Sequence, residues 1–186
     1  MIMPRTTREN VPQATRKSRG FSLIELLVVI AIILIIAAIA IPNFLRSRIA
    51  AHEAAGAEDL RAMTTAATAY SSTWGNGYPP TLAALGGFAV AATCDQAVLL
   101  DSNITTAPHE SNGYTFSYTG VGATIAQKPS NCSAPGFYAY LATAVPSNPG
   151  VSAVRSFCSD LPGVIHYDIT GAAIASPAAC DALPSL

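Results

Sequence analysis

Basic residues are scarce in most of this chain. Charged residues make up 11% of the 186 positions, and residues 21–186 carry five basic and ten acidic side chains, a net charge of −5. Proteins that bind nucleic acid depend on clustered Lys and Arg to neutralise phosphates. The composition therefore disfavours a nucleic-acid-binding module, and we do not expect nucleic acid as a direct partner.

Motifs for catalysis are also missing. His52-Glu53 lacks the second histidine of H-E-x-x-H, and His109 and His166 are isolated. Neither a G-x-S-x-G sequence nor a phosphate-binding glycine loop occurs. We therefore predict that the chain is not an enzyme and that it needs no cofactor.

One metal-binding interpretation stays open near the C-terminus. Asp160, Asp168 and Asp181 supply carboxylates, which are the ligands that calcium prefers. Their spacing is not that of a regular calcium loop. We therefore keep calcium as an alternative and do not assign a metal site.

The longest uninterrupted apolar run extends from Leu26 to Ile41. Together with residues 21–25 it forms a segment of 21 residues. As a helix this segment spans roughly 31 Å at about 1.5 Å per residue, enough to cross a bilayer core. Five basic residues precede it, against Arg46 and Arg48 just after it, so the positive-inside rule keeps the N-terminus cytoplasmic and the rest of the chain outside.

A specific motif marks the start of this segment. Gly20-Phe21-Ser22-Leu23-Ile24-Glu25 comes directly before the apolar residues, and Pro42 follows them. The arrangement resembles the class III leader and N-terminal helix of type IV pilins and type II secretion pseudopilins, in detail from Arg16 to Tyr70. The resemblance implies that a prepilin peptidase cleaves after Gly20 and that the new N-terminus, Phe21, is methylated.

The resemblance also implies a function and a location. Such a subunit is held in the bacterial inner membrane, polymerises with its own copies and ends in an extracellular type IV pilus. An inner-membrane assembly platform with its ATPase would drive that step. A major pseudopilin of a type II secretion system is the alternative, and a large head with two expected disulfides favours the pilus.

Glu25 is the one acid in the apolar segment. An ionised carboxylate near hydrocarbon costs several kcal/mol unless it has a partner. Cleavage turns the nitrogen of Phe21 into an amine with a reference pKa of about 7.7 to 8.0. The residues alone leave two pairings open, with its own helix end and terminus or with the terminus of an adjacent subunit. The resemblance implies the second, and it assigns Pro42 to filament assembly as a point where the helix loosens.

A conventional signal peptide is the rival interpretation. Ala38-Ile39-Ala40 has the pattern of a signal-peptidase site, and cleavage there would release a soluble secreted domain beginning at Ile41. Two features count against it. Glu25 interrupts the start of the apolar segment, and the helical pattern continues beyond the site.

The chain thus divides into a leader (1–20), a membrane and assembly helix (21–42), an amphipathic half of that helix (43–74) and a globular head (75–186).

In residues 43–74, apolar or small residues recur mostly at steps of three or four. They are Leu45, Ile49, Gly56, Leu60, Met63, Ala67, Tyr70 and Trp74. Arg46, Glu53, Arg61, Thr68 and Ser72 fall largely outside this stripe. We expect the stripe to pack on the head, and breakers at 75–80 to end the helix.

The head is expected to complete an α+β fold, with an antiparallel sheet whose one face packs on the helix. Residues 114–119 alternate large apolar and small polar side chains, which is typical of a half-buried strand. Further strands are expected at 137–143, 154–157, 164–169 and 172–174, with turns at 145–150 and 168–171. Thr81 is expected to cap a short helix ending at Leu85, and residues 88–108 to form a loop with one short helix or strand.

All four cysteines lie in the head, at Cys94, Cys132, Cys158 and Cys180. An exported head enters an oxidising compartment, which favours disulfides, and three pairings are possible. We favour Cys94 with Cys132 and Cys158 with Cys180, because sequential pairing closes the loop before the sheet and fastens the C-terminal segment. Metal binding by these cysteines is disfavoured, since C-x-x-C is absent and the spacings are wide.

Overall fold

The computed structural model describes residues 20–88 and 91–186, in two compact units with their boundary between Pro42 and Asn43. Its elements are α1 (Leu23–Trp74), η1 (Leu82–Leu85), α2 (Ser102–Thr105), β1 (Glu110–Ser111), β2 (Tyr114–Thr124), β3 (Phe137–Pro146), β4 (Ser156–Ser159), β5 (Ile165–Asp168) and α3 (Pro177–Asp181). The long helix and the sheet confirm the predicted α+β class. The leader lies outside the described residues except for Gly20.

The five strands pair antiparallel in the order in which they occur along the chain. β2 and β3 form the longest pair, with Tyr118 opposite Ala142 near its centre. Successive side chains of a strand point to opposite faces, and Tyr114, Phe116 and Tyr118 are all buried. The alternation of large apolar and small polar side chains that predicted β2 therefore also identifies the face of the sheet that packs on the core.

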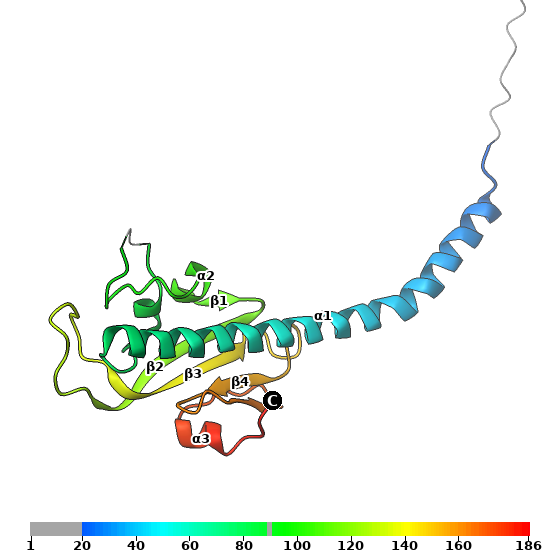
Figure 1. Cartoon of the computed structure of the whole chain (residues 1–186). Helices are drawn as coiled ribbons and strands as arrows, with labels where there is room; N and C mark the ends of the chain where they lie inside the picture. The colour runs from blue at the N-terminus through cyan, green and yellow to red at the C-terminus, as the bar shows by residue number, and fades with distance from the viewer. Residues whose placement is uncertain (1–19, 89–90) are drawn as a thin grey trace, which may run out of the picture. The chain divides into compact units, whose positions relative to one another are not determined.

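Residues 43–74 of α1 run across one face of the sheet (Figure 1). Leu60, Met63 and Tyr70 of the helix are buried in the same cluster as Tyr114 and Phe116 of β2. Fully burying one large apolar side chain stabilises a fold by about 1.5 to 3 kcal/mol. The helix is therefore part of the core from Ala57 to Tyr70, whereas Leu45, which was expected to pack on the head, is 51% exposed.

The helix backbone approaches β2 closely at Gly56. A Cβ atom at this position would lie 2.6 Å from Cδ2 of the Tyr114 ring, far inside the optimal separation of two carbons. Tyr114 is itself fully buried. The missing side chain of Gly56 is thus what lets the tyrosine ring lie against the helix.

The strand expected at 172–174 does not form, and that prediction is wrong. The free edge of β5 is covered by the C-terminal residues instead, because Tyr167 N–H donates to the carbonyl of Pro184 and Leu186 N–H to that of Ile165. The carbonyl of Ala172 accepts a hydrogen bond from the Ser156 hydroxyl at 2.7 Å. Residues 172–174 therefore have no sheet edge left to join.

Other boundaries differ in smaller ways. β3 continues to Pro146, two residues into the expected turn. Thr81 holds the N-cap position of η1, but its side chain makes no capping hydrogen bond, so that prediction is wrong in its mechanism. β1 and α3 were not predicted; α3 is capped by Ser176, whose hydroxyl oxygen accepts from the N–H of Ala179 at 3.2 Å.

Candidate functional site

Glu25 lies in the first turn of α1 and closes the N-terminal end of the helix. Its Oε2 atom accepts a hydrogen bond of 2.9 Å from the backbone N–H of Ser22, the residue just before the helix. The carbonyl of Ser22 accepts from the N–H of Leu26 at 3.3 Å. Serine followed three residues later by glutamate is the sequence of a capping box, and this contact is its glutamate half. Within one chain, the carboxylate thus has a partner at the positive helix end.

Gly20 and Phe21, the predicted cleavage site, precede the helix in non-helical backbone. The side chain of Phe21 is 78% exposed. Apart from chain neighbours, no described atom lies within 4 Å of the place where a Cβ of Gly20 would be. Within the described residues, nothing packs against Gly20 beside the peptide bond that joins it to Phe21.

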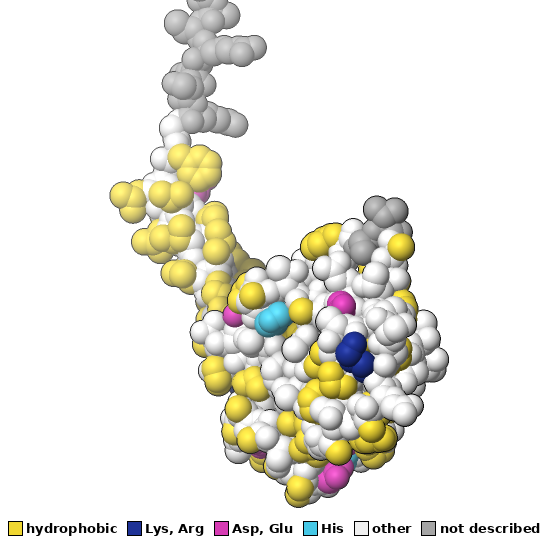
Figure 2. All heavy atoms as spheres, turned by 90° about the vertical axis from the view of Figure 1, so that its left-hand side faces the viewer, with side chains coloured by type: hydrophobic (Ala, Val, Ile, Leu, Met, Phe, Trp, Pro, Cys, Tyr) yellow, Lys and Arg dark blue, Asp and Glu magenta, His cyan; other side chains and the backbone are white. Residues whose placement is uncertain are grey.

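The apolar side chains that follow are exposed. From Leu23 to Leu45 the large ones have exposed fractions of 48 to 81%, and Figure 2 shows hydrophobic side chains around this part of the helix. By length and composition α1 could cross a membrane, and no residue of its most apolar 18-residue window is buried within the described structure. A surface of this kind requires lipid or other apolar helices around it.

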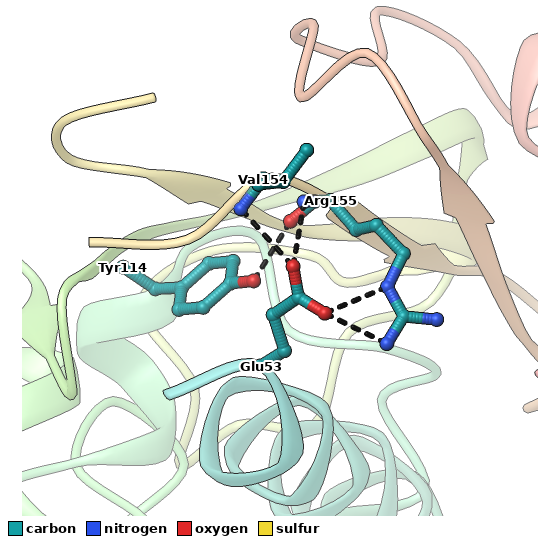
Figure 3. A network of polar contacts seen from close by, with 4 residues as sticks. All are labelled: Glu53, Tyr114, Val154 and Arg155. Atoms are coloured by element: carbon teal, nitrogen blue, oxygen red, sulfur yellow. Dashed lines mark hydrogen bonds and ion pairs between the residues drawn. The ribbon is translucent and has the colours of Figure 1, made fainter. Parts of the chain in front are cut away.

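Glu53, in the second half of α1, is bound through both of its carboxylate oxygens (Figure 3). Oε1 accepts from the backbone N–H groups of Val154 and Arg155 at 3.0 and 3.1 Å. Oε2 accepts from Nε and Nη2 of the Arg155 guanidinium at 2.8 and 2.7 Å. The Tyr114 hydroxyl donates to the Arg155 carbonyl at 2.7 Å. These charge-assisted bonds fasten α1 to the residues that lead into β4.

The hydrogen bonds determine the ionisation of Glu53. The residue is only 7% exposed, and this burial acts to raise the pKa of its carboxyl. The Arg155 side chain and the two backbone N–H groups act in the opposite direction and hold the pKa of Glu53 below its ordinary value. Glu53 is therefore an ionised, fully hydrogen-bonded carboxylate at neutral pH.

Glu53 is buried, so the prediction that it lies outside the apolar stripe is wrong. A step of four from Ile49 and a step of three to Gly56 both lead to position 53, so the spacing contained the signal. An acid at a buried helical position indicates a cation on the facing element. Arg155 is one of two basic residues in the head, so only two cations of the head could pair with Glu53.

Comparisons with known proteins concern the N-terminal part of the chain. The family model of the prokaryotic N-terminal methylation motif matches residues 15–41. The chain is 45% identical over 56 residues to the type IV major pilin protein PilA of Myxococcus xanthus (strain DK1622). The N-terminal part of the chain is thus similar to that of a type IV pilin and contains the N-terminal methylation motif. The aligned residues are 30% of this chain and 26% of the relative, so the chain spans about a quarter of the length of that pilin. No solved structure gives a significant match.

The head contains two disulfides, Cys94–Cys132 and Cys158–Cys180, which is the pairing favoured from the sequence. The first joins the segment after η1 to the connection between β2 and β3. The second joins β4 to α3. Each closes a loop and thereby restricts the unfolded chain.

The three histidines each contact a backbone carbonyl through Nδ1. His52 contacts the carbonyl of Asn112 in the turn between β1 and β2. His109 and His166 contact the carbonyls of Ile104 and Leu183, at 2.9 and 2.7 Å. These contacts give the histidines structural roles in holding turns and the C-terminal segment.

Of the three aspartates considered for calcium, Asp160 and Asp181 interact with each other, whereas Asp168 is bound within its own turn. Asp168 closes the turn after β5, where its oxygens accept from the N–H and hydroxyl of Thr170 at 2.9 and 2.7 Å. Asp160 is 4% exposed, and burial followed by the charge of Asp181 raises the pKa of its carboxyl. In residues 20–88 and 91–186, no three His, Cys, Asp or Glu side chains are placed to hold a metal together.

Proposed function

We propose that the chain is the structural subunit of a type IV pilus, cleaved after Gly20, methylated at Phe21 and polymerised through its N-terminal helix. The observation that carries this proposal is the exposed apolar surface from Phe21 to Leu45, with a single acid, Glu25, at its start. Soluble proteins rarely leave such a surface in water. Lipid before assembly and the helices of sister subunits after it would cover the surface.

Glu25 is proposed to select the register between subunits. Within the described residues only Oε2 of Glu25 is hydrogen-bonded, to the N–H of Ser22. Cleavage creates a cationic amine at Phe21, and the amine of an adjacent subunit would neutralise the carboxylate as the helices leave the lipid. A paired carboxylate costs far less in an apolar bundle than a lone one, so filament growth would favour the register in which this pairing forms. Pro42, which lacks an amide hydrogen, would let the helix adjust during the transfer.

The proposed partners follow from this life cycle. The basic leader holds the N-terminus in the cytoplasm, where a prepilin peptidase of the inner membrane removes it. An assembly platform with its ATPase then supplies the work of extraction. The disulfide-bonded heads would form the outer surface of the extracellular filament.

The mature N-terminus tests the proposal directly. We expect mass spectrometry of the protein purified from the cells that produce it to find N-methylated phenylalanine at position 21. A mature chain that begins at Ile41 would instead establish release by signal peptidase and refute polymerisation through this helix.

A pseudopilin of a type II secretion system is the second candidate, since the methylation motif is common to both assemblies. The similarity to a major pilin and the large disulfide-bonded head favour the pilus. Electron microscopy of cells with and without the gene separates the two. Loss of surface filaments on deletion, restored by complementation, supports the pilus, whereas unchanged filaments with impaired protein secretion support the pseudopilin.

A further inference from the structure

We propose that Asn103 is a site of asparagine-linked glycosylation that accepts an oligosaccharide from a lipid-linked pyrophosphate donor. Asn103-Ile104-Thr105 forms the acceptor sequence N-x-T, which marks a surface position in an exported protein. The inference rests on one part of the proposed function, namely that the head is delivered out of the cytoplasm.

The fold does not use the side chain of Asn103. The residue is exposed on α2, and within the described residues its carboxamide makes no hydrogen bond. Its contribution to the helix comes from the backbone, since its N–H donates to Oδ1 of the capping residue Asp101 at 2.8 Å. The amide nitrogen that would carry the sugar is therefore unoccupied and faces solvent.

The hydrogen bonds that hold the acceptor segment are local, although Ile104 is buried in the core cluster and Thr105 is only 7% exposed. The Thr105 hydroxyl, which the acceptor sequence requires, donates to the carbonyl of Asp101 at 3.1 Å, so α2 must open before a transferase reads it. The hydrogen bonds that close α2 all join residues 101–109. A helix of one turn is marginal by itself. Opening it exposes Ile104 and Thr105, while the hydrogen bonds between the strands and both disulfides lie outside residues 101–106.

A second acceptor sequence in the same head is held much more firmly. It is Asn131-Cys132-Ser133. Cys132 is 2% exposed and bonded to Cys94, 38 positions away. The Ser133 hydroxyl donates to Oδ1 of Asp95 at 2.6 Å, and the same oxygen accepts from the Ser133 N–H.

Lys128 adds a further restraint, because its Nζ donates to the carbonyl of Cys132 at 2.6 Å. An enzyme that binds an extended acceptor would have to break the long-range bonds to Asp95, break the local bond from Lys128 and strain the disulfide to Cys94. The folded head thus offers one usable acceptor and one blocked acceptor, and we infer that Asn103 is modified and Asn131 is not.

The transfer step requires a membrane-bound oligosaccharyl transferase and its lipid donor. A bond forms between the amide nitrogen of Asn103 and the anomeric carbon of the first sugar. The bond from that carbon to the pyrophosphate oxygen breaks, and its electron pair leaves with the lipid pyrophosphate. The amide nitrogen loses one proton, so no oxidant or reductant is needed.

Peptide mass spectrometry of the full chain, purified from the cells that produce it, tests the inference. We expect the peptide with Asn103 to carry the mass of whole sugar residues, and an amidase that cleaves N-glycans to leave aspartate at position 103. The peptide with Asn131 should have its unmodified mass. Detection of sugar on Asn131, or of Asn103 solely in unmodified form, would overturn the inference.

Three variants sharpen the test. Asn103→Gln keeps a carboxamide but removes the acceptor, and it should abolish the added mass completely. Thr105→Ser keeps the hydroxyl and should retain the glycan, while Asn131→Gln should have no effect on it. The N-terminal peptide of the same digest separates the two proposals: methylated Phe21 with bare Asn103 refutes the glycan alone, whereas a start at Ile41 refutes the pilin and leaves the glycan result valid.

Discussion

The two halves of α1 differ in what covers their apolar side chains. From Leu23 to Leu45 the large apolar residues are exposed, whereas Leu60, Met63 and Tyr70 are at most 1% exposed. The glutamates differ in the same way. Glu25 accepts one backbone hydrogen bond, and Glu53 is bonded to two backbone N–H groups and a guanidinium. The second half therefore finds its partners within the chain, and the first half requires partners outside it.

The largest expected effect concerns the first half. Glu25→Val removes the carboxylate that is proposed to pair with a neighbour's N-terminus while it increases the apolar character of the segment. We expect membrane insertion to persist and surface filaments to fall below detection in electron microscopy. Glu58→Val is the matched control, because Glu58 is an exposed glutamate in the other half of the helix, paired with Arg61. Normal filaments from the Glu25 variant would contradict the assigned role.

Glu53→Ala tests the second half of α1, and here the measured quantity is the stability of the fold instead of filament formation. The change leaves two backbone N–H groups and the Arg155 guanidinium without their acceptor, and we expect the free energy of unfolding to fall by about 3 kcal/mol. Chemical denaturation of the full chain in detergent measures it. Glu58→Ala should cost at most about 1 kcal/mol, since that pair is solvent-exposed. Equal losses in the two variants would show that the Glu53 network adds no stability.

Gly56→Ala probes the close approach of helix and sheet. The new methyl group would meet the buried Tyr114 ring, which is held in place by its hydrogen bond to the Arg155 carbonyl. Overpacking costs about 1 to 3 kcal/mol, and alanine returns up to about 1 kcal/mol in helix propensity, so we expect a net loss of about 1 kcal/mol. In a Tyr114→Leu background the same change should become neutral or stabilising in denaturant titrations. A loss of equal size in both backgrounds would rule out the ring as the cause.

The sequence predicted those parts of the fold in which periodicity and burial agree. The alternation of Tyr114, Phe116 and Tyr118 identified β2, and the run from Leu26 to Ile41 identified the exposed half of the helix. The prediction failed where long-range contacts decide. Residues 172–174 resemble a strand locally, but the C-terminal residues occupy the edge that they needed. The burial of Glu53 was not predicted, because a charged residue is expected to be exposed even where its spacing along the helix indicates a buried position.

Two buried acids, Glu53 in α1 and Asp160 in the head, provide the smallest and most discriminating test, because the shifts of their pKa values have opposite signs. The pKa of Glu53 is held below 4.5, so its contribution to stability is present above that pH and is lost as the pH falls through the folded-state value. The pKa of Asp160 is raised above 3.8 by burial and by Asp181, with His166 acting in the opposite direction. The neutral form of Asp160 thus favours the fold, and its contribution is complete below 3.8 and is lost as the pH rises through the raised value.

The test plots the denaturant midpoint against pH in the acid range for the wild type and for a variant in which one of the two acids is uncharged. The difference between wild type and variant should change with pH in opposite directions for the two acids. Relative to Glu53→Gln, the wild type should lose stability as the pH falls. Relative to Asp160→Asn, it should lose stability as the pH rises, since the ionised Asp160 is desolvated and lies near a second carboxylate. Parallel curves for wild type and Asp160→Asn would mean that Asp160 has solvent access that its 4% exposure excludes. A Glu25→Gln variant should show the same dependence of the denaturant midpoint on pH as the wild type, because the exposed half of the helix takes no part in the core of the head.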